Sequence, residues 1–148
     1  MVNLREIVTE EMLIECLELE VSDEQEGLVN TNAESLALAW FNRENTRPFC
    51  IYAGDEMVGF VMLLNDEPDK SCEIWQFMID EKYQGKGYGK AAVKAIIEYV
   101  KGYPVFETIN LGAFPDNDAA IKFYENCGFT LTGEVLDDGD EVVLELVL

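Results

Sequence analysis

The hydrophobic pattern at the start of the chain predicts a strand followed by two helices. Apolar and polar residues alternate in Val2–Val8, as in a strand with one buried face. Segment 9–20 then changes to helical spacing, with Thr9 as a possible N-cap and acidic residues in the first turn, where they suit the helix dipole. After a polar break, Ala33–Asn45 has the composition and spacing of a second helix.

Strand signals dominate the next part of the sequence. Runs 47–54 and 57–65 are apolar and rich in β-branched or aromatic residues, and the turn Gly54-Asp55-Glu56 separates them. A third run, 71–79, follows a polar loop. The three runs predict an antiparallel meander.

The remainder of the chain predicts two more helices and three more strands. Gly102 and the following Pro104 end the first helix, whereas Asp116 or Asn117 can cap the second and Gly128 closes it. In chain order, the predicted segments are a helix over 88–102, a strand over 105–113, a helix over 116–128, and strands over 129–136 and 141–148 that flank a hairpin turn at Asp137–Asp140. The order β-α-α-β-β-β-α-β-α-β-β predicts an α/β fold in which helices cover the faces of a mixed sheet.

Length and charge narrow the class of protein. At 148 residues the sequence suffices for one hydrophobic core and is short for two, so we expect a single domain over residues 1–148. The net charge of -20 argues against nucleic acid or anionic membranes as partners and favours a cationic partner. Solubility alone is the other explanation of this charge. The chain shows neither a basic leader nor a run of about 18 apolar residues, and we expect a cytoplasmic protein.

The amino-acid inventory excludes several kinds of chemistry. The chain contains no histidine, which removes Ser-His-Asp and Cys-His catalysis and every histidine-based zinc site. Proton transfer must therefore fall to Glu, Asp, Tyr, Lys or Cys. The four cysteines are far apart and lie in or beside apolar segments, which predicts reduced thiols, and we expect no metal site.

The segment "YQGKGYGKAA", Tyr83–Ala92, places three glycines, Gly85, Gly87 and Gly89, between a predicted strand and a predicted helix. Unobstructed N–H groups and the positive end of the helix dipole make such a junction an anion site. A Walker A loop does not fit, because no Ser or Thr follows the lysines. A dinucleotide fingerprint does not fit either, because the third glycine comes one residue early and the unit follows three antiparallel strands.

Two motifs together point to a different anion. Gln84, Gly87 and Gly89 occupy the fixed positions of (Q/R)-x-x-G-x-(G/A), and Asn117–Phe129 follows the pattern N-x-x-A-x-x-x-Y-x-x-x-G-F. On these motifs and on the predicted element order, the chain resembles the GNAT superfamily of acyl-CoA-dependent N-acetyltransferases. The resemblance implies a central, mostly antiparallel twisted sheet with helices on both faces.

A narrower resemblance concerns the acceptor. Val21, Gln25, Asn30 and Ser35 supply the pattern found in this region of the bacterial spermine/spermidine (diamine and polyamine) acetyltransferases. This likeness implies a small cationic amine as the acceptor. Other acceptors stay open, namely an amino acid, an aminoglycoside-type antibiotic or a protein N-terminus, as do a catalytically silent acyl-CoA-binding module and a nucleotide-binding regulator.

The superfamily resemblance implies acetyl-CoA as the cofactor. The loop N–H groups would hold its pyrophosphate, strand 77–79 would pair with its pantetheine arm, and the Met78 N–H would stabilise the charge that develops on the thioester oxygen. The residues implied in cofactor binding are Phe77, Met78, Ile79, Gln84, Gly85, Lys86, Gly87, Tyr88, Gly89, Lys90, Asn117, Ala120 and Tyr124.

Two residues are predicted to transfer protons. An alkyl ammonium has a pKa of about 10.4 and must lose a proton before it attacks. Glu73 is the candidate base, because strand alternation would put Glu73, Trp75 and Phe77 on one face. Tyr124, on the tyrosine position of the second motif, would protonate the departing thiolate.

Carboxylates near the acceptor would bind its distal ammonium and raise the rate of encounter. The predicted substrate-binding residues are Glu20, Asp23, Glu34, Glu73 and Trp75. The apolar C-terminal strand lies either at a sheet edge, where it can pair across a homodimer, or in the core.

Overall fold

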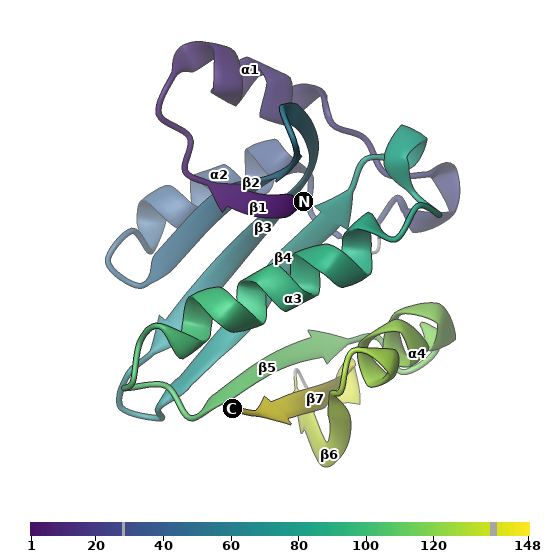
Figure 1. Cartoon of the computed structure of the whole chain (residues 1–148). Helices are drawn as coiled ribbons and strands as arrows, with labels where there is room; N and C mark the ends of the chain where they lie inside the picture. The colour runs from purple at the N-terminus through teal and green to yellow at the C-terminus, as the bar shows by residue number, and fades with distance from the viewer. Residues whose placement is uncertain (28, 137–138) are drawn as a thin grey trace.

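One seven-stranded sheet runs through the residues that the computed structural model describes, 1–27, 29–136 and 139–148. Its order is β1-β2-β3-β4-β5-β7-β6, and each neighbouring pair is antiparallel except β4 and β5, which run parallel (Figure 1). The strands are β1 (Val2–Arg5), β2 (Thr46–Ala53), β3 (Glu56–Asp66), β4 (Ser71–Ile79), β5 (Thr108–Ala113), β6 (Thr130–Leu136) and β7 (Glu141–Val147). The predicted element order and the mixed, mostly antiparallel sheet are confirmed.

Helices cover both faces of this sheet. The α-helices in the described residues are α1 (Glu10–Glu18), α2 (Asn32–Phe41), α3 (Tyr88–Lys101) and α4 (Asp118–Asn126), and the short 3-10 helices are η1 (Asp23–Gln25) and η2 (Glu81–Tyr83). Thr9 caps α1 as predicted, since its hydroxyl accepts a hydrogen bond from the Met12 N–H at 3.1 Å. None of the helices in these ranges has both the length and the apolar character needed to cross a membrane.

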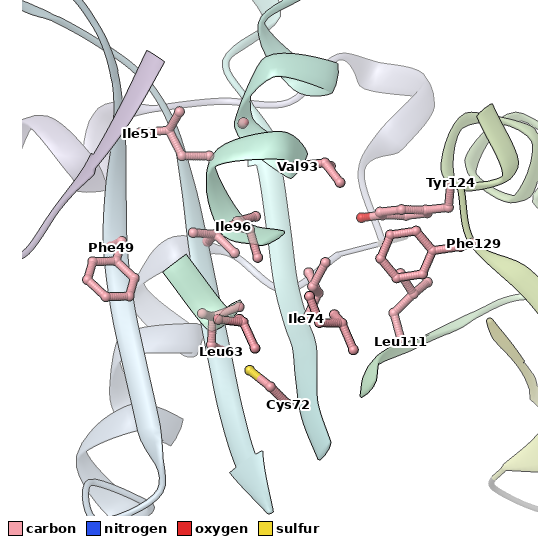
Figure 2. Packing of buried hydrophobic residues seen from close by; sticks show 14 of the residues in the cluster. Phe49, Ile51, Leu63, Cys72, Ile74, Val93, Ile96, Leu111, Tyr124 and Phe129 are labelled. Atoms are coloured by element: carbon pink, nitrogen blue, oxygen red, sulfur yellow. The ribbon is translucent and has the colours of Figure 1, made fainter. Parts of the chain in front are cut away.

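A separate hydrophobic core fills each face. The larger one packs Val93 and Ile96 of α3 and Tyr124 of α4 against the sheet, as Figure 2 shows. The smaller one lies under α1 and α2 and contains Cys16 and Met78. All four cysteines are free thiols, three of them buried. Burial of apolar surface on both faces is the main stabilising contribution to such a three-layer arrangement.

The C-terminal strand β7 lies inside the sheet, between β5 and β6. Leu144 of β7 is completely buried, whereas every residue of β6 is exposed. The strand at this edge is therefore β6, and the open question about the C-terminal strand is settled in favour of the core. Part of the predicted second turn, Asp137 and Asp138, lies outside the described residues.

The parallel strands β4 and β5 pair only at their beginnings. The paired positions run from Ser71 and Thr108 to Glu73 and Asn110. Beyond them β4 continues to Ile79, and Figure 1 shows the two strands diverging from their shared end. The backbone of β4 therefore presents an edge toward a widening opening in the middle of the sheet.

A β-bulge changes the phase of β4 inside this opening. On β3, Met62 and Leu63 are consecutive, but their partners on β4 are Gln76 and Ile74, so Trp75 is an extra residue. Trp75 packs against the core under α1 and α2, whereas Phe77 packs against the core under α3. The predicted shared face of Glu73, Trp75 and Phe77 is therefore wrong for Phe77, because simple alternation does not pass through a bulge.

Candidate active site

A cavity of about 1010 Å³ occupies the opening between β4 and β5. One end lies against the segment between α1 and α2, and the other end lies against the beginnings of α3 and α4. The predicted site residues that line it are Glu73, Trp75, Phe77, Met78, Ile79, Gln84, Gly85, Gly87, Tyr88, Gly89, Lys90, Asn117, Ala120 and Tyr124. The opening thus brings together residues from both sequence motifs and from β4.

The glycine segment forms a bare turn that leads into α3. Gly85 and Gly87 adopt φ values of 74° and 84°, a region that favours glycine, and the space that a Cβ would fill is open at both. Gly87 is the N-cap of α3 and offers no side chain to the first helical N–H groups. Gly89 has a different role, because a Cβ there would meet the Phe123 ring of α4 at 3.3 Å.

The first turn of α3 differs in charge from those of the other α-helices in the described ranges. Helices α1, α2 and α4 each carry an acidic residue in their first turn, which satisfies the positive end of the helix dipole. Helix α3 carries none, although the whole chain has 30 acidic residues, and Lys90 lies there instead. Exposed amides, an unopposed dipole and a lysine suit the turn Gly85–Lys90, hereafter the anion-binding turn, to an anion.

Gln84 connects the anion-binding turn to the opposite wall of the cavity. Its side-chain N–H group donates to the Gln25 side-chain oxygen at 2.8 Å and to the Ile79 carbonyl at 2.9 Å. The same Gln25 oxygen accepts the Ser22 N–H at 3.3 Å. Gln84 therefore holds the segment between α1 and α2 against the end of β4. Lys86 does not line the cavity, and its ammonium lies 5.9 Å from the centre of the Tyr83 ring.

Hydrogen bonding on β4 corrects the predicted oxyanion donor. The Asp80 N–H donates to the Val58 carbonyl on β3 at 2.8 Å, and successive residues of a strand direct their polar backbone groups to alternate sides. Met78 therefore directs its N–H toward β3. Phe77 and Ile79 direct theirs toward the opening, in agreement with the Gln84 contact at the Ile79 carbonyl. The Met78 N–H therefore does not face the opening, whereas the Phe77 N–H does.

Tyr124 lies in the wall of the cavity on α4 and is only 8% exposed. Its ring packs edge-on against Phe77 and Phe129, with centroid distances of 6.4 and 5.6 Å. In Figure 2 its hydroxyl points away from α4 and toward the sheet. Burial, and secondarily the charge of a Cys127 thiolate, raise the pKa of the Tyr124 phenol. The phenol therefore keeps its proton throughout the neutral pH range.

Asn117 has two roles, because it is the N-cap of α4 and also lines the cavity. Its side-chain oxygen accepts the Ala120 N–H at 3.2 Å. This bond fixes the start of α4 and therefore the position of Tyr124, which lies two helical turns further along. The sequence motif is therefore also a structural motif.

Three predicted acceptor residues do not line the cavity: Glu20, Asp23 and Glu34. Glu34 closes a capping box at the start of α2, where its carboxylate accepts the Thr31 N–H and hydroxyl at 3.1 and 2.9 Å. These hydrogen bonds lower the pKa of Glu34. Glu20 is exposed and contributes backbone bonds, since its N–H donates to the Asp80 carboxylate at 3.1 Å. The Glu34 carboxylate therefore stabilises the start of α2 and does not line the cavity.

Several lining residues were not predicted from the sequence. Among them are Glu24, Gln76, Gly112, Phe123 and Glu141. Glu24 follows the predicted Asp23 in η1, and only the structure shows that Glu24, and not Asp23, lines the cavity. Gly112 and Glu141 lie on β5 and β7, whose pairing brings them together across a long stretch of sequence. No local pattern signals that contact.

Comparison with known proteins agrees with this geometry. The model of the acetyltransferase (GNAT) family matches residues 9–129. Spermine/spermidine N(1)-acetyltransferase of Bacillus subtilis is 35% identical over 105 residues, which cover 67% of this chain and 69% of that protein. N-alpha-acetyltransferase RimI of Mycobacterium tuberculosis is 30% identical over 101 residues, 64% of this chain and 61% of that protein.

A solved structure extends the likeness to the whole fold. Spermidine N-acetyltransferase from Vibrio cholerae, in complex with CoA and spermine, superimposes with a TM-score of 0.73 at 20% identity, over 99% of this chain and 95% of that chain. The family match covers most of the sequence and both motifs of the cavity. This chain belongs to the GNAT family and is an acetyl-CoA-dependent N-acetyltransferase.

Proposed function

We propose that this enzyme transfers the acetyl group to a primary amine of a small polycation, such as spermine, spermidine or a diamine. The observation that carries the proposal is the division of charge in the cavity. Its anion-binding end has Lys90 and the open turn of α3, and the rest of its wall bears Glu24, Glu73 and Glu141. The likeness to a spermine/spermidine acetyltransferase supports the same acceptor class.

The cavity residues fit acetyl-CoA. The amides of Gly85–Gly89 would hold the pyrophosphate, and Lys90 would approach a phosphate. The unpaired edge of β4 would bind the amide groups of the pantetheine arm, and the Phe77 N–H would stabilise negative charge on the carbonyl oxygen. When bound, acetyl-CoA supplies an activated acetyl thioester.

Glu73 would accept the proton that the attacking amine loses. It is half-buried, lines the cavity and lies at the last paired position of β4 and β5, where the opening begins. A carboxylate at this position can take the proton directly or through one water. The Cys72 thiol beside it is buried, which together with the Glu73 charge raises the Cys72 pKa to about 12 and keeps that thiol out of acid–base chemistry.

Tyr124 would give a proton to the departing thiolate. It reaches the cavity from α4, on the wall formed with Phe77, whose N–H faces the opening. A phenol with a raised pKa is fully protonated at neutral pH, so the acid form is available for each turnover. Glu73 on β4 and Tyr124 on α4 are thus assigned opposite proton transfers.

The acceptor assignment predicts a ranking of substrates. With acetyl-CoA and a thiol-release assay, kcat/KM should be highest for spermine, spermidine or 1,4-diaminobutane, because dications match the carboxylates of the cavity. Amino acids, an aminoglycoside and a peptide with a free N-terminus serve as comparison substrates. Preferred acetylation of the peptide would favour the activity named for the Mycobacterium relative, and would remove the polyamine assignment.

The anion-binding turn predicts a selective loss of CoA affinity in Gly87→Ala. The matched control is Gly54→Ala in the turn between β2 and β3, because both glycines have positive φ and open space at the Cβ. Each variant should lose about 1–2 kcal/mol of unfolding free energy. Only Gly87→Ala should also weaken CoA binding, by about tenfold in calorimetry, since it reorients the amides of the turn. Equal CoA affinity in the two variants would contradict the assignment.

The role of Tyr124 predicts a change in both rate and pH dependence. Tyr124→Phe should reduce kcat about 100-fold and preserve CoA affinity, whereas the control Tyr99→Phe, in the same core but outside the cavity, should preserve both. Because burial raises the Tyr124 pKa, the acid form is lost only as pH rises above the ordinary phenol value of about 10. The wild-type rate should fall in that range, and a Tyr124→Phe enzyme with an unchanged rate would exclude the residue.

A further inference from the structure

A second carboxylate enters the cavity beside the candidate base. Glu141, the first residue of β7, is half-buried and lines the cavity. Its carboxylate lies against Gly112 of β5, at the place that a Cβ on Gly112 would occupy. A larger residue at position 112 would displace this carboxylate. The bare backbone of Gly112 therefore forms a recess that holds Glu141 at the cavity wall.

The side chains of Glu141 and Glu73 point to the same face of the sheet. Leu144 belongs to the core under α3, so Glu141, an odd number of residues away on β7, points to the opposite face. On β4, Cys72 and Ile74 belong to the same core, so Glu73 between them also points to the opposite face. Both carboxylates therefore meet a ligand that arrives from the side of α1 and α2.

Strand register separates Glu73, along the opening, from Gly112, against which the Glu141 carboxylate lies. Glu73 pairs with Asn110 of β5, and Gly112 lies two residues further along that strand. Two residues of a strand span about 7 Å. A short dication can therefore contact Glu73 with one end and Glu141 with the other.

Apolar side chains accompany these carboxylates. Leu136 of β6 pairs with Glu141, lines the cavity and is 41% exposed. Trp75, the bulge residue of β4, lines the cavity as well. An apolar wall next to a carboxylate matches an alkyl ammonium, whose stem is apolar and whose end is charged.

The charge of the cavity also favours an acceptor with more than one positive charge. The charged side chains that line it, within the described ranges, are Glu24, Glu73, Lys90 and Glu141. Lys90 belongs to the first turn of α3, at the anion-binding end. A monoamine would leave most of the negative charge on the acceptor side uncompensated, whereas a diamine or polyamine compensates more of it.

We propose that Glu141, held in the recess of Gly112, binds the second ammonium of the acceptor and gives the enzyme its preference for diamines and polyamines over monoamines. Glu73 serves the reacting amine, and Glu141 serves the distal one. This inference rests on the proposed function and names the residue that sets the acceptor preference.

The test compares 1,4-diaminobutane with 1-aminobutane at saturating acetyl-CoA. In Glu141→Gln, the ratio of the two kcat/KM values should fall about tenfold, because a charge-assisted contact is lost for the diamine alone. Gly112→Ala should lower the ratio in the same direction by displacing the carboxylate. The control Glu134→Gln, on exposed β6 and outside the cavity, should leave the ratio unchanged. Unchanged CoA affinity shows that each variant is folded.

A second readout separates this inference from the proposed function. Calorimetric titration of the CoA complex with each amine should show weaker binding of the diamine, and not of the monoamine, in Glu141→Gln. If the wild type acetylates neither amine, the proposed acceptor class fails, and the titration still decides the role of Glu141. The inference is overturned by an unchanged diamine preference, or by an equal loss of rate for both amines, which would place Glu141 at the reacting amine instead.

Discussion

The early end of the pairing between β4 and β5 is the constraint on which the rest of this site depends. Two parallel strands that stay paired would fill the middle of the sheet, whereas here pairing stops at Glu73 and Asn110. The bulge at Trp75 adds to the bend and twist of β4 at the same place. The polar backbone groups of Phe77 and Ile79 then face an opening, where unpaired groups require a partner. Gln84 already satisfies the Ile79 carbonyl, and a ligand with amide groups can satisfy others.

Electrostatics then divide this opening between two ligands. The positive end of α3, which lacks the acidic first-turn residues of α1, α2 and α4, suits an anion. The carboxylates on β4 and β7 suit a cation that arrives at the other face. The net charge of -20 is therefore not spread evenly over the cavity, because the first turn of α3 carries Lys90 and no acidic residue. A hydrogen bond of 2.8 Å from Gln84 to Gln25 joins the anion-binding turn to the segment between α1 and α2.

Local sequence signals predicted the elements and the anion-binding turn, because glycine spacing, helix caps and hydrophobic periodicity act over a few residues. Most of the errors come from features that local patterns do not contain, and the one at Glu34 comes from a local pattern that was missed. Alternation along β4 failed at the bulge, which moved Phe77 to the other face. Met78 was taken as the backbone donor from the family resemblance, but the pairing of β4 with β3 directs its N–H away from the opening. Glu34 was taken for an acceptor residue although its spacing from Thr31 is that of a capping box. The contact of Gly112 with Glu141 depends on the pairing of β5 with β7, and tertiary register alone produces it.

Amide hydrogen exchange at single-residue resolution, with and without CoA, tests the central claim most directly. The Met78 N–H is directed toward β3 and should be protected in both states. The Phe77 and Ile79 amides face the opening, so CoA should slow their exchange while Met78 stays unchanged. A CoA-dependent change at Met78 without one at Phe77 and Ile79, or no change along β4 at saturating CoA, would contradict the account.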